Sequence, residues 1–290
     1  MSEEGGRPAA ASATVDDGVL ICPVCGLPLG RDGGRYICPS AHSFDIAREG
    51  YVNLLLSTQK ASPDPGDNRL MVERRRDFMA AGHYAALAEL VAVLAGAYVP
   101  ASRPGRVLDA GCGEGYLLRE MGSRLGAERT IRWGVDISRW AVRSAARSDT
   151  SATLAVASIH HLPVLSESID LLVSVLSPRH FGEFRRVLAP GGHLLVVVPD
   201  EKHLLELRRQ VYWKVLPHQV DAKLTPGEGF TALAEDRVNF SLSLDREGLD
   251  QLVAMTPYLW HLRGDARQRL ERLDGLDTRA AFVARVFRRS

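Results

Sequence analysis

Four side chains near the N-terminus have the types and the spacing of a metal site. Cys22 and Cys25 are separated by two residues, and Cys38 and His42 follow as a second pair separated by three residues. Two thiolates this close form one half of a tetrahedral site, and the second pair closes it. Three Cys ligands and one His leave no open coordination position, so the spacing predicts a structural zinc ion. The bound metal would supply the stability that so small a segment lacks.

A glycine-rich turn carries a second set of candidate residues. Asp109 ends a predicted strand. The glycines come directly after it and before a predicted helix, at Gly111, Gly113 and Gly115. Glycine lets the backbone approach a ligand closely, and the amino end of a helix attracts negative charge. An acid in front of such glycines is well placed to bind the ammonium group of a methionine moiety.

The ends of the next two predicted strands extend this site. Asp136 ends the next predicted strand, within the segment Gly-Val-Asp-Ile-Ser, where a carboxylate can accept hydrogen bonds from both ribose hydroxyls of a nucleotide. Ser158 follows the next strand, where a backbone amide can pair with an adenine ring. The third glycine of a dinucleotide fingerprint would fall at Tyr116. The pattern therefore predicts an S-adenosylmethionine site, with a dinucleotide site and an ordinary tight turn as the alternatives.

Cys112 lies inside the same turn and could be read as a nucleophile, as in the methylation of cytosine at C5. The Pro-Cys dipeptide of those enzymes is absent here, since the residue before Cys112 is Gly111. We therefore interpret Cys112 as a small residue of the turn.

The elements that must position these residues alternate between strand and helix. Strands are predicted at Arg106–Ala110, Ile131–Asp136, Leu154–Ala157, Ile169–Leu176 and His193–Val198, and helices at Tyr116–Leu125, Arg139–Ala146 and Phe181–Leu188. Such alternation at these spacings implies a mostly parallel sheet with helices on both faces.

The order changes on both sides of this alternation. Before it, a polar segment with two prolines follows Ser57, and apolar spacing predicts helices between Arg69 and Tyr98 with a break near Gly82. After it, the pattern predicts a helix at Glu201–Trp213, a strand at Val238–Leu244, a helix at Glu247–Met255 and a strand at Ala280–Phe287. Two late strands around a helical insert suit an antiparallel hairpin at the edge of the sheet.

The composition is that of an ordinary globular protein, with 46% hydrophobic and 24% charged residues. No uninterrupted apolar run approaches the roughly 20 residues that a membrane span needs, and the polar, acidic start is neither a signal nor a transit peptide. We expect residues 1–18 to form a disordered tail, the thiols to be reduced, and the protein to be cytoplasmic. Only four of the 36 basic residues are Lys, and Arg suits phosphate binding and base stacking.

Longer motifs resemble one family of RNA-modifying enzymes. They are Cys22-Pro-Val-Cys25, Tyr36-Ile-Cys-Pro39, His42-Ser-Phe-Asp45, Glu49-Gly-Tyr-Val-Asn-Leu-Leu55, Asp64-Pro-Gly-Asp67, Ala81-Gly-His-Tyr84, Leu188-Ala-Pro-Gly-Gly192, His203-Leu-Leu-Glu-Leu207 and Met255-Thr-Pro-Tyr-Leu-Trp260. In this order they resemble the 23S rRNA guanine-N1-methyltransferases, zinc-containing enzymes that modify a hairpin lining the peptide exit tunnel. Some members of that family confer resistance to macrolides such as tylosin. The family's Tyr/Phe-Ala-Pro segment reads Leu176-Ser-Pro178 here.

The resemblance implies a class I methyltransferase fold, Rossmann-like, with a seven-stranded mostly parallel sheet and a small zinc-binding module before it. It divides the chain into the tail (1–18), the zinc-binding RNA-recognition module (19–56), a linker and helix (57–84) and the methyltransferase domain (85–290). It also implies that Tyr84, Gly113, Glu114 and His203 contact the cofactor. Without the resemblance, Tyr84 and His203 would be read as packing or surface residues.

The expected reaction is methyl transfer from S-adenosylmethionine to N1 of a guanine in that hairpin. Guanine N1 carries a proton at neutral pH, so a base must accept it, and His203 is the candidate. Arginines of the module and of the following helix would grip the RNA: Arg31, Arg35, Arg48, Arg74, Arg75 and Arg76. A methyltransferase for a small molecule and a non-catalytic RNA-binding protein are the alternatives. The sequence does not identify the guanine that is modified. A homodimer and a role in antibiotic resistance are both compatible with it.

Overall fold

The small N-terminal sheet is antiparallel, and the predicted metal ligands lie before its first strand and between its second and third strands. The computed structural model describes residues 18–126, 128–212, 215, 227–256 and 264–290. In its first part, β1 (Gly30–Asp32) pairs with β2 (Arg35–Ile37), and β2 pairs with β3 (Ser43–Asp45). Three residues per strand bury little surface, so this sheet depends on what binds it and on what it packs against.

The large sheet carries most of the core. Within the described residues its order is β10 (Phe230–Asp245), β11 (Gly275–Arg289), β9 (Leu188–Pro199), β8 (Ile169–Val175), β5 (Gly105–Ala110), β6 (Thr130–Asp136), β7 (Thr153–Val156) and β4 (Tyr51–Asn53). Neighbours from β9 to β4 are parallel, while β11 is antiparallel to both β9 and β10. The predicted parallel sheet with a hairpin at its edge is confirmed.

The sheet has eight described strands, and the prediction of seven was wrong. The additional strand is β4, which lies in the segment assigned to the zinc module and pairs with β7. Three residues give too short an alternation to predict a strand, and a parallel pairing between residues about 100 apart leaves no local signal. The module therefore contributes a strand to the large sheet and covers its edge.

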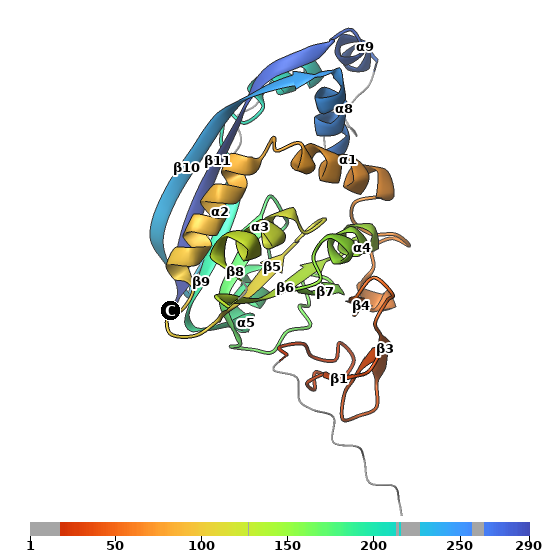
Figure 1. Ribbon diagram of the computed structural model, residues 1–290, viewed down its shortest axis with the longest axis vertical. Helices are drawn as coiled ribbons and strands as arrows, with labels where there is room; N and C mark the ends of the chain where they lie inside the picture. The colour runs from red at the N-terminus through yellow and green to blue at the C-terminus, as the bar shows by residue number, and fades with distance from the viewer. Residues whose placement is uncertain (1–17, 127, 213–214, 216–226, 257–263) are drawn as a thin grey trace, which may run out of the picture.

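Helices cover the two faces of the sheet unequally (Figure 1). One face packs against α2 (Ala85–Tyr98), α3 (Tyr116–Leu125) and α4 (Arg139–Ser148), whose buried residues share one cluster with alternate residues of the strands. The opposite face packs against α5 (Phe181–Val187) and against the module, including Val19 and Leu20. The module is thus joined to the sheet by a common hydrophobic core.

Helix α1 (Arg69–Ala80) precedes α2 and turns sharply from it. Its first turn is capped by Asn68, whose side chain accepts a hydrogen bond from the amide of Met71. The break falls at Gly82, with φ of +81°, as the sequence predicts. Among the described residues no single helix has the length and apolarity to cross a membrane, and α1 with α2 meets that test only as a pair bent by 84°.

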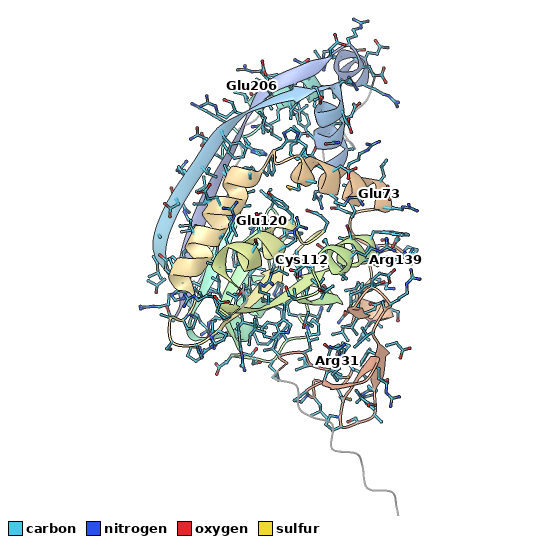
Figure 2. The ribbon with its side chains drawn as sticks, viewed as in Figure 1. Arg31, Glu73, Cys112, Glu120, Arg139 and Glu206 are labelled. Atoms are coloured by element: carbon cyan, nitrogen blue, oxygen red, sulfur yellow. The ribbon has the colours of Figure 1, made fainter. Side chains whose placement is uncertain are left out.

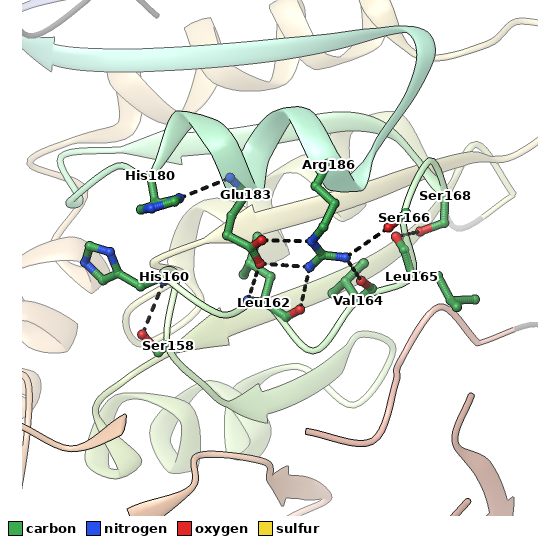
Figure 3. A network of polar contacts seen from close by, with 10 residues as sticks. All are labelled: Ser158, His160, Leu162, Val164, Leu165, Ser166, Ser168, His180, Glu183 and Arg186. Atoms are coloured by element: carbon green, nitrogen blue, oxygen red, sulfur yellow. Dashed lines mark hydrogen bonds and ion pairs between the residues drawn. The ribbon is translucent and has the colours of Figure 1, made fainter. Parts of the chain in front are cut away.

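A polar network fixes the loop on which the module rests (Figure 3). Arg186 of α5 donates to the carbonyl oxygens of Leu162 and Val164, at 2.8 and 2.7 Å, and pairs with Glu183 at 2.8 Å. Burial alone would raise the pKa of Glu183, but Arg186 and the Leu162 amide outweigh it and lower that pKa. Leu20 forms a β-bridge with Val164, so the loop held by Arg186 is the one that anchors the module.

The late elements differ from their predicted bounds. Helix α6 (Leu205–Val211) begins four residues later than predicted, after Leu204 at φ +50°, and the predicted end at Trp213 lies outside the described residues. Strand β10 begins eight residues earlier than predicted. Helices α8 (Arg246–Met255) and α9 (Asp265–Glu271) lie between β10 and β11, at the end of the hairpin away from the module (Figure 1).

Candidate functional site

The four predicted metal ligands converge on one point. The Sγ atoms of Cys25 and Cys38 are 3.6 Å apart, and the Nδ1 atom of His42 lies 3.4 Å from the Sγ of Cys38 and 3.6 Å from that of Cys22. All four ligand atoms lie within 4.8 Å of one another. A tetrahedral site with Zn–S near 2.3 Å and Zn–N near 2.0 Å has edges of roughly 3.5 to 3.8 Å. The donor set therefore fits a zinc ion bound by three Cys and one His.

Two tight turns bring these ligands together. In the first, the amide of Gly26 donates to the carbonyl of Cys22, and Gly26 takes φ of +73°. In the second, the amide of Cys38 donates to the carbonyl of His42. The backbone amide of Leu27 is the largest influence on Cys25 and lowers the pKa of its thiol to about 6. A thiolate is the form that binds metal, so the turn favours a ligand that is ready to bind.

The glycine-rich turn connects β5 to α3 and lies against the end of β6. The amides of Gly111 and Cys112 both donate to the carbonyl of Val135, at 2.8 and 3.0 Å. Gly111, Gly113 and Gly115 have φ of +92°, +56° and +82°. A Cβ on Gly111 would lie 2.4 Å from the Cβ of Ser177. Glycine is therefore required at position 111 by space as well as by backbone conformation.

Asp136 lies beside this turn at the end of β6. One carboxylate oxygen accepts a hydrogen bond from the amide of Gly113 at 3.0 Å, and the other accepts one from Ser138 at 2.8 Å. Burial nevertheless raises the pKa of this carboxyl, against the two amides, which lower it. A carboxylate has about four lone-pair sites, so both oxygens keep the capacity to accept from ribose hydroxyls.

Asp109 and Glu114 are buried carboxylates, the first before the glycines and the second between Gly113 and Gly115. Asp109 is 2% exposed, and its burial, together with the charges of Asp136 and Glu114, raises its pKa to about 8. No described hydrogen-bond donor offsets this burial. Burial also raises the pKa of Glu114, although Arg75 acts in the opposite direction. A buried carboxylate in this state is stabilised by a cation, so the turn fits the ammonium of the predicted cofactor.

Ser158 lies where the sequence predicts, directly after β7. It is 5% exposed, and its hydroxyl accepts a hydrogen bond from the amide of His160 at 3.2 Å. The preceding residue, Ala157, donates to the carbonyl of Asp136. Ser158 therefore lies one strand away from Asp136, at the same edge of the sheet.

Tyr84 and His203 come together as a second group around Phe282 of β11. Their ring centroids lie 5.3 and 4.6 Å from that of Phe282. His203 is 6% exposed, and its Nδ1 atom accepts a hydrogen bond from the amide of Ala281 at 3.2 Å. The neutral ring therefore carries its proton on Nε2. These contacts hold both side chains in the core, whereas the three carboxylates face one another across the glycine-rich turn.

Cys112 does not have the properties of a nucleophile. It lies inside the body of the molecule, whereas Arg31 and Arg139 lie at its outside (Figure 2). Its burial, together with the neighbouring carboxylates Asp109, Asp136 and Glu114, raises the pKa of its thiol well above the ordinary value. The thiol stays protonated, in agreement with its interpretation as a small residue of the turn.

The sequence motifs assign no role at this site to Asp67, Ser138 or Ser177, and they assign a different role to Arg75. The carboxylate of Asp67 forms an ion pair with Arg75 at 2.6 Å, and the backbone carbonyl of Asp67 accepts a hydrogen bond from the hydroxyl of Ser138. Ser177 donates to the carbonyl of Ala110 at 2.8 Å. The signal for Asp67 was its place in the Asp-Pro-Gly-Asp motif. Arg75 had been predicted to grip RNA with its neighbours, but it extends towards the glycine-rich turn instead.

Replacement of Asp109 by Asn is expected to stabilise the cofactor-free protein above neutral pH. The folded-state pKa of about 8 lies above the ordinary value of 3.8 for this carboxyl. Unfolding therefore releases a proton between these values, and stability falls as pH rises through that window, by up to about 1.4 kcal/mol per pH unit. Thermal melts of the two proteins at pH 5, 6.5 and 8 should diverge with rising pH. Parallel curves would show that Asp109 is ionised in the folded protein throughout.

Comparisons with known proteins agree with this geometry. A zinc-ribbon family model described as "RlmA, N-terminal" matches residues 20–63, and a model described as "Methyltransferase domain" matches residues 107–192. A 23S rRNA (guanine(748)-N(1))-methyltransferase of Streptomyces fradiae is 37% identical over 264 residues, covering 89% of this chain and 91% of its own. A Micromonospora griseorubida protein assigned as a 23S rRNA (guanine-N1-)-methyltransferase is 37% identical over 262 residues, covering 83% and 87%. One of Bacillus subtilis with the same assignment is 30% identical, covering 91% and 95%.

Proposed function

The chain belongs to the family of 23S rRNA (guanine-N1)-methyltransferases, and on that premise we propose that it methylates N1 of a guanine in a 23S rRNA hairpin. The observation that carries the proposal is the conjunction of a Cys3His cluster, whose Cys22 and Cys38 share a hydrophobic core with β5 and β6, and buried carboxylates at the ends of those two strands. The Streptomyces fradiae relative is named for guanine 748, and we propose the equivalent guanine as the target. Since that substrate is ribosomal, the protein would act in the cytoplasm.

Each part of the cofactor has a matching group in this chain. The Asp109 carboxylate suits the ammonium group, Asp136 suits the ribose hydroxyls, and the backbone of the glycine-rich turn lets the ligand approach β5 closely. Ser158 lies where the adenine would end. The cofactor supplies an electrophilic methyl group on a sulfonium. The protein supplies alignment of that group with guanine N1, which accounts for a large part of the rate of such a displacement.

The RNA surface is proposed to lie on the module and on the neighbouring end of α4. Arg48 is 88% exposed, and Arg143 and Arg147 of α4 pair with Glu49 of the module while remaining partly exposed. These contacts bring arginines from two parts of the chain onto one surface that can bind phosphates. Guanine N1 lies on the paired edge of the base, so the target must be extruded to reach the sheet.

A small-molecule methyltransferase is the competing proposal, and it gives no role to the module. The module contributes β4 to the large sheet, and its residues continue the core beneath β5 and β9. Curated relatives that share the module and cover most of the chain are named for rRNA. Primer extension on 23S rRNA incubated with protein and S-adenosylmethionine tests the proposal, because a methyl at N1 blocks base pairing. A stop at one guanine supports it, and an unmodified template would refute it.

His203 is proposed to position the cofactor or the incoming guanine, held in place by the hydrogen bond that its Nδ1 atom accepts from the amide of Ala281. We expect His203→Ala to lower single-turnover methylation at least about tenfold, equivalent to about 1.4 kcal/mol of transition-state stabilisation. His193 lies in the middle of β9 and packs against Tyr98 with the two rings tilted, so His193→Ala is the matched control. Zinc content should be unchanged in both, and thermal melts should show that both variants remain folded at the assay temperature. A rate within about twofold of the wild type would place His203 in the scaffold.

A further inference from the structure

Arg75 occupies a position on α1 where an apolar residue would be expected. The buried residues of α1 are Met71, Val72, Phe78 and Met79, and Arg75 lies between them at spacings of three and four residues. It is therefore on the face that packs into the protein, while Arg76 points outward and is 56% exposed. The Arg75 side chain is only 22% exposed. A partly buried guanidinium on the inner face of a helix needs specific partners.

The guanidinium of Arg75 reaches the glycine-rich turn. Its Nη2 atom lies 2.6 Å from a carboxylate oxygen of Asp67 and donates to the carbonyl of Met255 at 3.1 Å. Its Nη1 atom lies 3.7 Å from the point that a Cβ on Gly113 would occupy. Burial alone would lower the pKa of Arg75, but the charges of Asp67, Glu114 and Asp136 outweigh it and raise that pKa.

Asp67 is itself held in place beside the ribose position. Its carbonyl accepts a hydrogen bond from the hydroxyl of Ser138 at 2.6 Å, and Ser138 donates its amide to Asp136. Gly66 packs tightly here, since an added Cβ would lie 2.8 Å from Ile137. The Asp-Pro-Gly-Asp loop thus fixes the carboxylate that directs Arg75, and the guanidinium has little freedom to point elsewhere.

Without Arg75, the charges of the site would complement every charged group of the cofactor except its carboxylate. S-adenosylmethionine carries an ammonium, a sulfonium and a carboxylate. Asp109, Glu114 and Asp136 suit the cationic groups and the ribose, but all three would repel the carboxylate. Among the described residues, Arg75 is the cation whose charge acts on both Glu114 and Asp136. Since Nη2 of Arg75 binds Asp67 and Met255, the Nη1 group beside Gly113 is the one that can donate a charge-assisted hydrogen bond to the cofactor's carboxylate.

We propose that Arg75 binds the carboxylate of the cofactor's methionine moiety and that Asp67 is the positioning residue that directs it there. This inference rests on the proposed function, because it assumes that the site takes S-adenosylmethionine. It gives the Asp-Pro-Gly-Asp loop and α1, which precede the methyltransferase domain in the chain, a direct part in cofactor binding. The competing explanation is that Arg75 only neutralises Glu114 and Asp136.

Titration calorimetry with two ligands that differ in one group separates these explanations. The ligands are S-adenosylmethionine and its decarboxylated form, which keeps the ammonium and the sulfonium. The wild type should bind the first at least about tenfold more tightly than the second, because a hydrogen bond to a charged partner is lost. In Arg75→Gln this preference should disappear, mainly through weaker binding of S-adenosylmethionine. Asp67→Asn should reduce the preference, and Arg75→Lys should keep part of it.

Arg76→Gln is the matched control, since Arg76 is the next residue of α1 and pairs with Asp77 at the surface. It should bind both ligands as the wild type does. The inference would be overturned if Arg75→Gln and Asp67→Asn each lost the same factor of affinity for both ligands. It would also be overturned if neither variant changed either affinity. If Arg75→Gln fails to fold, Asp67→Asn and Arg75→Lys decide the question by the same ratio. A wild type that binds neither ligand would instead refute the proposed function.

Discussion

Replacement of Cys38 by Ser is expected to release the metal and to lower methylation of 23S rRNA by about a hundredfold or more. Cys38 is one of the four ligands, and a serine hydroxyl binds zinc much more weakly than a cysteine thiolate does. The small sheet has three-residue strands, so without the metal it loses the geometry that presents its arginines. The dissociation constant for S-adenosylmethionine should change less than about threefold, because the carboxylates lie on other elements.

Ser43→Ala is the control for this experiment. Ser43 follows His42 directly, is exposed, and does not belong to the cluster of ligands. Zinc content by mass spectrometry, cofactor affinity by calorimetry and methyl transfer to rRNA are compared in the three proteins. Metal-free Cys38→Ser protein that still methylates rRNA at the wild-type rate would show that the module has no part in the reaction.

Replacement of Gly111 by Ala should weaken cofactor binding by about five- to 150-fold, the range that corresponds to overpacking by 1–3 kcal/mol. The new Cβ would lie 2.4 Å from the Cβ of Ser177, and φ of +92° is strained for alanine. The turn must move, and Asp109 and Gly113 move with it. Calorimetry with S-adenosylmethionine measures the loss.

Two further variants separate backbone strain from the steric clash. Gly191 has φ of +75° but no atom within 4 Å of its added Cβ, so Gly191→Ala reproduces the strain without the clash. Its cofactor affinity should equal that of the wild type. Ser177→Gly in the Gly111→Ala background removes the clash and should restore part of the affinity. If Gly111→Ala binds the cofactor normally, the ligand does not lie against this turn.

Much of the fold could be predicted because its signals are local. Helix α3 has the predicted bounds, since an apolar stripe and the preceding glycine mark it within one stretch of sequence. The metal ligands were equally clear, because the spacing of Cys22, Cys25, Cys38 and His42 is itself the chemistry. In both cases the residues that determine the feature lie within about 20 positions of one another.

The features that were missed depend on distant parts of the chain. Strand β10 extends through Glu235, Asp236 and Arg237, whose charges hide the strand in the sequence but are tolerated at the exposed edge beside β11. Strand β4 forms only because β7 leaves a free edge. Arg75 looks like part of a basic surface triplet until Asp67 and the glycine-rich turn are placed beside it. Pairing partners of this kind are not encoded in local periodicity.

The most direct test of the proposed function is the identity of the nucleoside that receives the methyl group. Purified protein is incubated with unmodified 23S rRNA and with S-adenosylmethionine carrying an isotopically labelled methyl group, and the RNA is digested to nucleosides for mass spectrometry. We expect the label in 1-methylguanosine, at about one methyl group per rRNA molecule, and we expect no label when Asp109→Asn protein is used. Label in another nucleoside, or none in the RNA, would contradict the proposed function.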